Sequence, residues 1–273
     1  MTFPWHTLSL PFSKAPDVHE IIVIGSGYGG GVAASRLSRA NRSVTVLERG
    51  REIAPGDYPK TGPEMAQAVQ VDISDKDQRL GDADALFDLR VGKDMSVLVG
   101  CGLGGTSLIN ANVAIEPDAR VFKSWPAPFN ISDPSHDDHL DLAPFYQRAR
   151  QMLGSAPYPA DKTLPKLDAL EHAAKGMKAR FTRPDINVTF QDGYNAAGVW
   201  QKACNDCGDC VSGCNVGAKN TVLMNYLPDA KAHGAQLYTG ARVSHIAREG
   251  AGWKVCVHDG ETLRTLSLSL IHI

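Results

Sequence analysis

A group of glycines and a more distant acid give the first part of the chain the residue types of a dinucleotide-binding loop. Residues 25–30 carry the pattern Gly-x-Gly-x-Gly-Gly directly after the apolar run 21–24. Gly25 permits a tight turn, Gly27 lets the backbone approach a pyrophosphate, and Gly30 lets a helix pack close to a strand. Glu48, 18 residues after Gly30, stands near the usual spacing of an acceptor for a ribose hydroxyl. Because such an acid disfavours a 2′-phosphate, the pattern predicts FAD or NAD rather than NADP.

The segments around this loop predict the elements that must position it. The run 21–24 is rich in β-branched residues and is typical of a strand buried on both faces. Residues 31–40 follow as a helix with Val32, Ala33 and Leu37 inward, and 44–47 form the next strand. The helix N-terminus would offer free N–H groups and a partial positive charge to the phosphates. The whole is a βαβ unit around a phosphate-binding turn.

A second glycine cluster lies far downstream. Residues 100–105 contain Gly100, Gly102, Gly104 and Gly105, and small polar residues and Asn110 follow. Such a loop is another place where the backbone can approach a ligand. A nicotinamide-binding domain needs no second loop of this kind, whereas a flavoprotein does, because the flavin ring and ribityl chain extend well past the first turn. The second cluster therefore favours FAD over NAD.

Four cysteines within eleven residues form the other candidate centre. Their spacing, C-x2-C-x2-C-x3-C, is that of a bacterial [4Fe–4S] cluster, and the residues are Cys204, Cys207, Cys210 and Cys214. Gly208 and Gly213 would supply the backbone angles that such a wrap needs. Zinc fits a single tight run less well, because it prefers two separated knuckles.

Two features separate this run from ferredoxin sequences. Asn215 follows the last cysteine where proline is usual, and the chain has no second run of cysteines. One cluster would need all four thiols, or Cys101 or Cys256 in place of Cys214. The alternatives of a cluster, a zinc ion, and structural thiols or disulfides stay open at this point.

Composition excludes several classes of protein. The chain has 273 residues, of which 43% are hydrophobic and 21% charged, which is ordinary for a globular protein. The net charge of −2 gives no basic footprint for nucleic acid. The sequence has no apolar run of about 18 residues, so no membrane span is expected. Because the first twenty residues lack the pattern of a secretory signal, we expect a cytoplasmic protein.

The motifs together resemble the glucose–methanol–choline (GMC) oxidoreductase family, most closely its cholesterol-oxidase-like branch. The resemblance rests on residues 25–30, 47–50, 102–110, 144–146 with 152–154, 217–227 and 239–243. It implies FAD and oxidation of an alcohol carbon, in which a base takes the hydroxyl proton while hydride passes to the flavin. Oxygen or another acceptor would then reoxidise the flavin. The branch suggests a sterol or another bulky apolar alcohol as substrate.

The resemblance also assigns individual residues. Covalent members of the family carry a histidine in the second glycine loop, and residues 106–108 contain none, so noncovalent FAD is expected. Gly102 and Gly105 would belong to the cofactor site, Asn110 would lie near the flavin ring, and Val243 would contact the adenine through its backbone. The family's catalytic histidine lies near the C-terminus of a much longer chain. His272 does not match that pattern, so we name no catalytic residue.

We therefore expect an α/β fold: a Rossmann-type FAD-binding domain with an inserted α+β cap or substrate region, truncated at its C-terminus. The expected boundaries are 18–115 and 218–273 for the FAD-binding domain and 116–217 for the insertion with the Cys-rich loop. The sheet would lack its later strands, and the residues from 265 onward break off a new strand pattern that starts near Trp253. A chain of this kind would bind FAD poorly and turn over little.

The insertion carries mostly structural signals. Residues 142–153 have an apolar helical face that predicts core packing, and 167–177 suggest a second helix. Residues 186–190 alternate as a strand, and Trp125 and Trp200 are expected in the core, with the lining of an apolar cavity as the alternative. Residues 136–139, His-Asp-Asp-His, are expected to form a solvated loop rather than a metal site.

Two other functions stay open from the sequence. The first is an iron–sulfur flavoprotein reductase that draws electrons from a nicotinamide, although the chain shows no second nucleotide-binding glycine motif for NAD(P)H. The second is a non-catalytic metal-binding or electron-transfer module, which would contain iron and sulfide without flavin.

Overall fold

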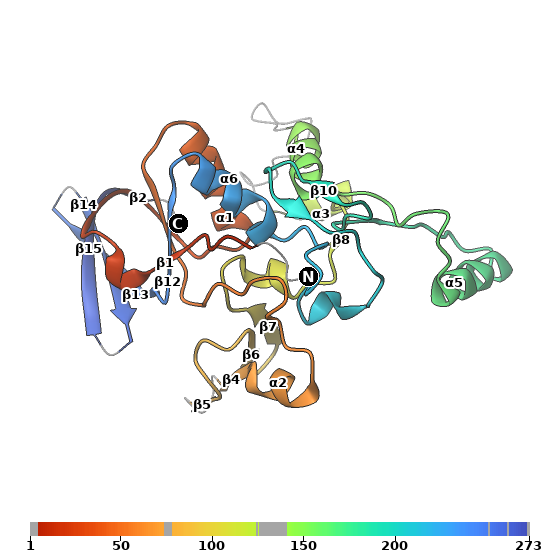
Figure 1. Cartoon of the computed structure of the whole chain (residues 1–273), viewed down its shortest axis with the longest axis horizontal. Helices are drawn as coiled ribbons and strands as arrows, with labels where there is room; N and C mark the ends of the chain where they lie inside the picture. The colour runs from red at the N-terminus through yellow and green to blue at the C-terminus, as the bar shows by residue number, and fades with distance from the viewer. Residues whose placement is uncertain are drawn as a thin grey trace.

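A seven-stranded sheet forms the larger body of the protein (Figure 1). The computed structural model describes residues 5–73, 78–123, 125, 141–250, 252–260 and 262–271. Five neighbouring strands of the sheet are parallel and two further strands are antiparallel. Their order is β1 (Leu10–Pro11), β12 (Gln236–Thr239), β3 (Val44–Leu47), β2 (Val18–Ile24), β15 (Thr262–Ile271), β14 (Gly252–Asp259) and β13 (Arg242–Glu249). The predicted α/β class is confirmed.

The predicted βαβ unit stands at the centre of this sheet. Strands β2 and β3 flank helix α1 (Tyr28–Arg39), which begins three residues before the predicted start at residue 31. The prediction that Val32 faces inward was wrong, since that side chain is 37% exposed. The buried face of α1 consists of small residues instead: Gly31, Ala34, Ser35 and Ser38.

Small residues on α1 allow a close neighbour. Helix α6 (Tyr226–Ala232) packs on α1, and a Cβ at Gly31 would meet Val222 Cγ1, just before α6, at 2.3 Å. The Ser35 hydroxyl donates to the buried Asp229 carboxylate of α6 at 2.6 Å. Because both helices are fixed to each other, the start of α1 is held in place relative to the sheet.

Both faces of the main sheet are buried. Ile21, Val23 and Val46 face the core shared with α6, whereas Ile22 and Leu47 face a second core that includes Val255 and Val257. Alternate residues of one strand point to opposite faces, so a strand buried on both sides must be apolar throughout. The run at 21–24 is continuously apolar because its strand is buried on both faces.

The last three strands of the described chain join the main sheet. Strands β13, β14 and β15 form an antiparallel meander, and β15 then pairs in parallel with β2, with Ser267 opposite Val18 and Ile271 opposite Ile22. The strand pattern expected near Trp253 is β14. The final described stretch forms β15, which runs to Ile271 beside the central strand β2.

A smaller four-stranded sheet leads into the second glycine loop; it lies at the bottom of Figure 1. Its order is β5 (Gln78–Leu80), β4 (Val69–Ile73), β6 (Phe87–Val91) and β7 (Ser96–Gly100), and the 3₁₀ helix η3 (Gly105–Leu108) follows. Helix α2 (Gly62–Gln67) precedes β4 and starts with a capping box of Thr61 and Glu64. The small sheet therefore delivers Gly100 to its place beside the first loop.

The segment expected as an insertion has little regular structure. It contains α3 (Ala119–Lys123), α4 (Ala143–Leu153) and α5 (Pro165–Gly176). Short strand pairs join β8 (Val113–Ala114) to β9 (Asp185–Ile186) and β10 (Gly193–Tyr194) to β11 (Trp200–Gln201).

The remaining 3₁₀ helices of the described chain are η1 (Phe12–Lys14), η4 (Asp209–Val211) and η5 (Val222–Met224).

Several predictions within this segment need correction. Helix α4 lies where expected, and its apolar face packs on the core only in part. Met152 and Leu153 are partly buried against the main core cluster, whereas Phe145 is 48% exposed. The strand expected over 186–190 ends at Ile186, with a single further bridge at Val188. Trp125 and Trp200 are 44% and 39% exposed, so the expectation that they lie in the core was wrong. Residues 136–139 and His272 lie outside the described residues.

In the part of the chain that the structure describes, no helix is long and apolar enough to cross a membrane.

Candidate functional site

The two glycine loops meet at the carboxyl ends of β2 and β3. Gly25 follows β2 with a φ of +85°, which favours glycine, and its N–H donates to Leu47 O at the end of β3 at 2.8 Å. Gly105, at a φ of +58°, lies so close to the first loop that a Cβ there would be 2.8 Å from Gly27 Cα. Two stretches of backbone thus approach each other with no side chains between them.

Two other predicted glycines lie under the loops and allow close packing. A Cβ at Gly30 would stand 1.9 Å from Gly25 O, so only glycine lets α1 start against the turn. Gly102 is also confined, since a Cβ there would meet Leu108 Cδ1 at 3.0 Å and Arg51 O at 3.2 Å. These glycines shape the loops rather than line an open surface.

Glu48 ties the first loop to its surroundings. Its carboxylate is buried, and Oε2 accepts the Ser26 N–H at 3.0 Å and the Ser26 hydroxyl at 2.6 Å. Oε1 accepts the Gly50 N–H at 2.9 Å. A carboxylate offers about four lone-pair positions, so Glu48 retains acceptor capacity on Oε1 while it braces the loop.

Ser26 joins the first loop to the second. Its hydroxyl accepts the Gly104 N–H at 2.9 Å while it donates to Glu48. The side chain is fully buried. Sequence reasoning did not single out Ser26, which occupies a variable position of the glycine pattern, and its role depends on a contact 78 residues away in the chain.

The loops border a cleft of about 300 Å³. Five of the eight residues predicted to bind cofactor line it: Gly25, Gly27, Glu48, Gly105 and Val243. Helix α1, twelve residues long, begins beside it, with Gly27 as its N-cap and no acidic residue in its first turn. The first N–H groups of a helix lack intrahelical partners, so this end favours an anion such as a diphosphate.

Arginines gather at one end of the cleft. Arg49, Arg90 and Arg242 line it together with Val243, and the same four residues line a neighbouring cavity of about 420 Å³. Val243 lies on β13 next to a bulge, opposite Val257 of β14. The arginine end therefore continues past the cleft, away from the glycine turn. Contact with the cofactor was predicted from the sequence for Val243, whereas no role was predicted for these arginines.

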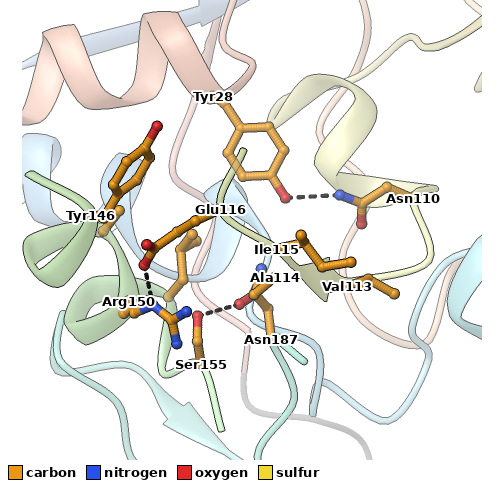
Figure 2. A pocket seen from close by; sticks show the side chains of 12 residues that line it. Tyr28, Asn110, Val113, Ala114, Ile115, Glu116, Tyr146, Arg150, Ser155 and Asn187 are labelled. Atoms are coloured by element: carbon orange, nitrogen blue, oxygen red, sulfur yellow. Dashed lines mark hydrogen bonds and ion pairs between the residues drawn. The ribbon is translucent and has the colours of Figure 1, made fainter. Parts of the chain in front are cut away.

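Asn110 lies outside this cleft, in a second pocket of about 250 Å³ shown in Figure 2. Its Nδ2 donates to the Tyr28 hydroxyl at 2.8 Å. Tyr28 is the first residue of α1 and directly follows Gly27, so the pocket adjoins the cleft. Burial raises the pKa of the Tyr28 phenol, and the Asn110 hydrogen bond opposes this in part.

The wall of the second pocket is largely apolar. Val113, Ala114, Ile115 and Leu153 contribute to it, and Figure 2 shows the first three on the strand side of the pocket. Opposite them, Arg150 is paired with Glu116 at 2.8 Å. Tyr146, Ala149 and Leu153 of α4 also line the pocket, so part of the apolar face of that helix faces the pocket while its end packs against the core.

The four cysteines of the predicted cluster are all free thiols. Within the described residues, no group of three or more His, Cys, Asp or Glu side chains is arranged to hold a metal ion. Burial raises the pKa values of the Cys204 and Cys210 thiols in the metal-free chain. The structure gives no support to the cluster, which was predicted from spacing.

Cys101 and Cys256, the alternatives to Cys214 as cluster ligands, are also not part of a metal-holding group within the described residues. Cys101 is buried in the second glycine loop, where burial raises its pKa to about 11. Cys256 is buried in β14, paired in register with His245 of β13 and Thr265 of β15.

A buried lysine joins the cysteine segment to the second loop. Lys219 is 2% exposed, and its Nζ donates to the carbonyl oxygens of Asn110, Cys210 and Leu108 at 2.6, 2.8 and 3.2 Å. Burial lowers the pKa of Lys219 to about 8. Lys219 lies within the segment 217–227 that carries part of the resemblance, but the sequence assigned it no role. The three carbonyls come from two separate segments, so spacing gave no signal.

The parallel sheet, the glycine turn at the carboxyl ends of its strands and the acid after the second strand define a Rossmann-type fold of the flavoprotein kind. The sequence profile of the GMC oxidoreductases matches residues 20–263. The chain belongs to the GMC oxidoreductase family, whose members typically bind FAD.

Individual relatives agree with this assignment. The chain is 31% identical over 268 residues to a cholesterol oxidase of Mycobacterium tuberculosis, across 91% of this chain and 43% of that protein. It is 27% identical over 246 residues to a long-chain-alcohol oxidase of Arabidopsis thaliana, across 85% of this chain and 27% of that protein. The chain thus spans less than half the length of these relatives.

A solved structure shares the fold. A fungal aryl-alcohol oxidase superposes with a TM-score of 0.53 at 16% identity, covering 93% of this chain and 45% of that one. At this identity the likeness concerns the fold alone.

Proposed function

We propose that the chain binds FAD noncovalently between the two glycine loops and serves the oxidation of an alcohol CH–OH group. The observation that carries this proposal is the contact of the loops, in which Gly105 approaches Gly27 beside the buried Glu48. A Cβ at Gly105 would stand 2.8 Å from Gly27 Cα, so the loops reach this close approach only with glycine at position 105.

The residues present fit this cofactor. The start of α1 suits a diphosphate, and Glu48 keeps acceptor capacity for a ribose hydroxyl. Val243 borders the opposite end of the cleft, where the adenine is expected. Residues 106–108 contain no histidine, so no side chain of the kind that forms the family's covalent link is offered there.

An apolar alcohol is the substrate that the second pocket favours. Its wall of Val113, Ala114 and Ile115 adjoins Asn110 and Tyr28, and apolar surface is stabilised when it binds apolar surface. The relatives named above include oxidases of cholesterol and of long-chain alcohols. A sterol or another bulky apolar alcohol, with oxygen as the acceptor, is therefore the finer part of the proposal.

The division of labour follows from the chemistry of the cofactor. Bound FAD supplies the hydride acceptor for the carbinol carbon. The chain binds the dinucleotide, while Asn110 and Tyr28 present polar groups at the border between cleft and pocket. No base that takes the hydroxyl proton is assigned among the residues of this chain.

The test is anaerobic reduction of the FAD-loaded protein. A sterol or long-chain alcohol should bleach the visible flavin absorbance, because it reduces the cofactor, whereas NADH should not. Bleaching by NADH and not by alcohols would favour an iron–sulfur flavoprotein reductase. Bound flavin that no alcohol bleaches would contradict alcohol oxidation by this chain.

A further inference from the structure

A buried carboxylate holds two arginines at one end of the cleft. Asp88 lies on β6 with its side chain 3% exposed, and both arginines reach the same oxygen. Arg90 donates to Asp88 Oδ2 through Nε at 3.1 Å and Nη2 at 3.0 Å, and Arg49 Nη2 contacts that oxygen as well. One carboxylate charge therefore faces two guanidinium charges. Asp88, Arg49 and Arg90 together keep a net positive charge.

The position of the pair relates it to a ligand in the cleft. Arg49 directly follows Glu48, and both arginines line the cleft beside Val243. They also line the neighbouring cavity, which the glycines of the first loop do not. The pair therefore stands at the end away from Tyr28, Asn110 and the second pocket.

The chemistry of the pair suits a purine nucleoside. A guanidinium is a planar, permanently charged group that stacks on aromatic ring faces and donates in a fixed fork. Asp88 accepts hydrogen bonds from some of the N–H groups of each guanidinium. It thereby fixes the orientation of both, since bonds between arginine and carboxylate are strong and directional. The Arg90 side chain is still 53% exposed, so the held guanidinium remains accessible.

We propose that Arg49 and Arg90, held by Asp88, recognise the adenosine half of the dinucleotide and select FAD over FMN. This rests on the proposed function, because it takes the cleft to be the FAD site. Asp88 acts as a positioning residue, and the two arginines contact the ligand.

The test compares affinities for FAD, FMN and ADP by fluorescence titration or calorimetry. Arg90→Ala should weaken the binding of FAD and of ADP about tenfold, a loss of about 1.4 kcal/mol, and leave FMN binding unchanged. Arg90→Lys keeps the charge without the planar fork and should restore only part of the affinity. Asp88→Asn, whose folding is checked by circular dichroism, should weaken FAD and ADP in the same direction.

Arg42→Ala is the matched control. Arg42 is 48% exposed and pairs with Glu20, away from the cleft, so the variant removes one positive charge and should leave all three affinities unchanged. The proposal is overturned if Arg90→Ala binds FAD and ADP as tightly as the wild type, or loses FMN by the same factor as FAD. The wild type could bind ADP, with an affinity that falls in Arg90→Ala, and yet not bind FAD. In that case the proposed function fails, while the assignment of the arginines to the adenosine stands.

Discussion

The hydroxyl of Ser26, a fully buried residue in the turn after β2, donates to Oε2 of Glu48 at 2.6 Å. The same hydroxyl accepts the N–H of Gly104 at 2.9 Å. One side chain therefore connects the acid of the first loop to the backbone of the second. The two halves of the proposed cofactor site are positioned by this connection before any ligand binds.

Replacing Ser26 should separate the loops. Ser26→Ala leaves the Gly104 N–H and one lone pair of Glu48 without a partner in a buried place, which should lower the free energy of unfolding by about 1–3 kcal/mol. We expect FAD affinity to fall about tenfold, because the loops are no longer held at the binding distance. Chemical denaturation and FAD titration measure the two effects.

Ser212→Ala is a suitable control for this change, because Ser212 is only partly buried and its hydroxyl donates to Asp209 O within its own turn. Equal losses of FAD affinity in the Ser26 and Ser212 variants would show that the connection between the loops has no part in binding.

Two adjacent glycines of α1 should respond in opposite ways to alanine. At Gly30 the new Cβ would stand 1.9 Å from Gly25 O, whereas at Gly29 no atom lies within 4 Å. Gly30→Ala should destabilise the protein by about 3 kcal/mol or more, because the backbone must shift. Gly29→Ala should stabilise it by about 0.5–1 kcal/mol, because alanine favours the helix. Thermal unfolding compares them, and a similar effect of both would refute the close approach at Gly30.

The buried Lys219 predicts a dependence of stability on pH. Its folded-state pKa of about 8 lies below the ordinary value of 10.5. Between these values the unfolded chain binds more protons than the folded one, so this group adds stability as pH rises from about 8 to about 10.5. Below that window the charge is carried in both states and opposes folding.

Lys219→Met removes this titration and keeps a similar shape. We expect the difference in unfolding free energy, wild type minus variant, to rise by about 3 kcal/mol across the window. Urea unfolding at a series of pH values measures it. Lys231→Met provides a control, because Lys231 bonds to backbone carbonyls of Thr7 and Leu8 while its side chain is exposed. A difference between wild type and Lys219→Met that does not change with pH would contradict the lowered pKa of Lys219.

The local part of the site could be predicted from sequence because its physics is local. The turn at Gly25, the helix that starts after Gly27 and the strand that ends before Glu48 are contiguous along the chain. Spacing and residue type suffice for such a unit, and only the orientation of α1 was misjudged, since its small residues rather than Val32 pack on the neighbour.

The remainder depends on contacts between distant segments. Asp88 meets Arg49 from 39 residues away, and Lys219 reaches Asn110 O from 109 residues away. Neither pairing leaves a periodic signal in the sequence. Helix α4 shows the same limit. Part of its apolar face lines a pocket with Tyr28 while Met152 and Leu153 pack against the core, and an apolar stripe does not say which partner it meets.

The cysteine run shows how spacing can mislead. Its intervals match those of a cluster-binding loop, yet the described structure does not gather Cys204, Cys207, Cys210 and Cys214 into a metal-holding group. Spacing limits which thiols could reach one cluster, and the backbone decides whether they do.

The most direct test of the FAD site is the visible absorbance spectrum of the protein purified anaerobically and supplied with FAD, followed by denaturation and filtration. The account predicts a resolved flavin band that stays with the folded protein, and free FAD in the filtrate after denaturation. A protein that remains colourless with FAD present, or flavin that stays attached to the denatured chain, would contradict it.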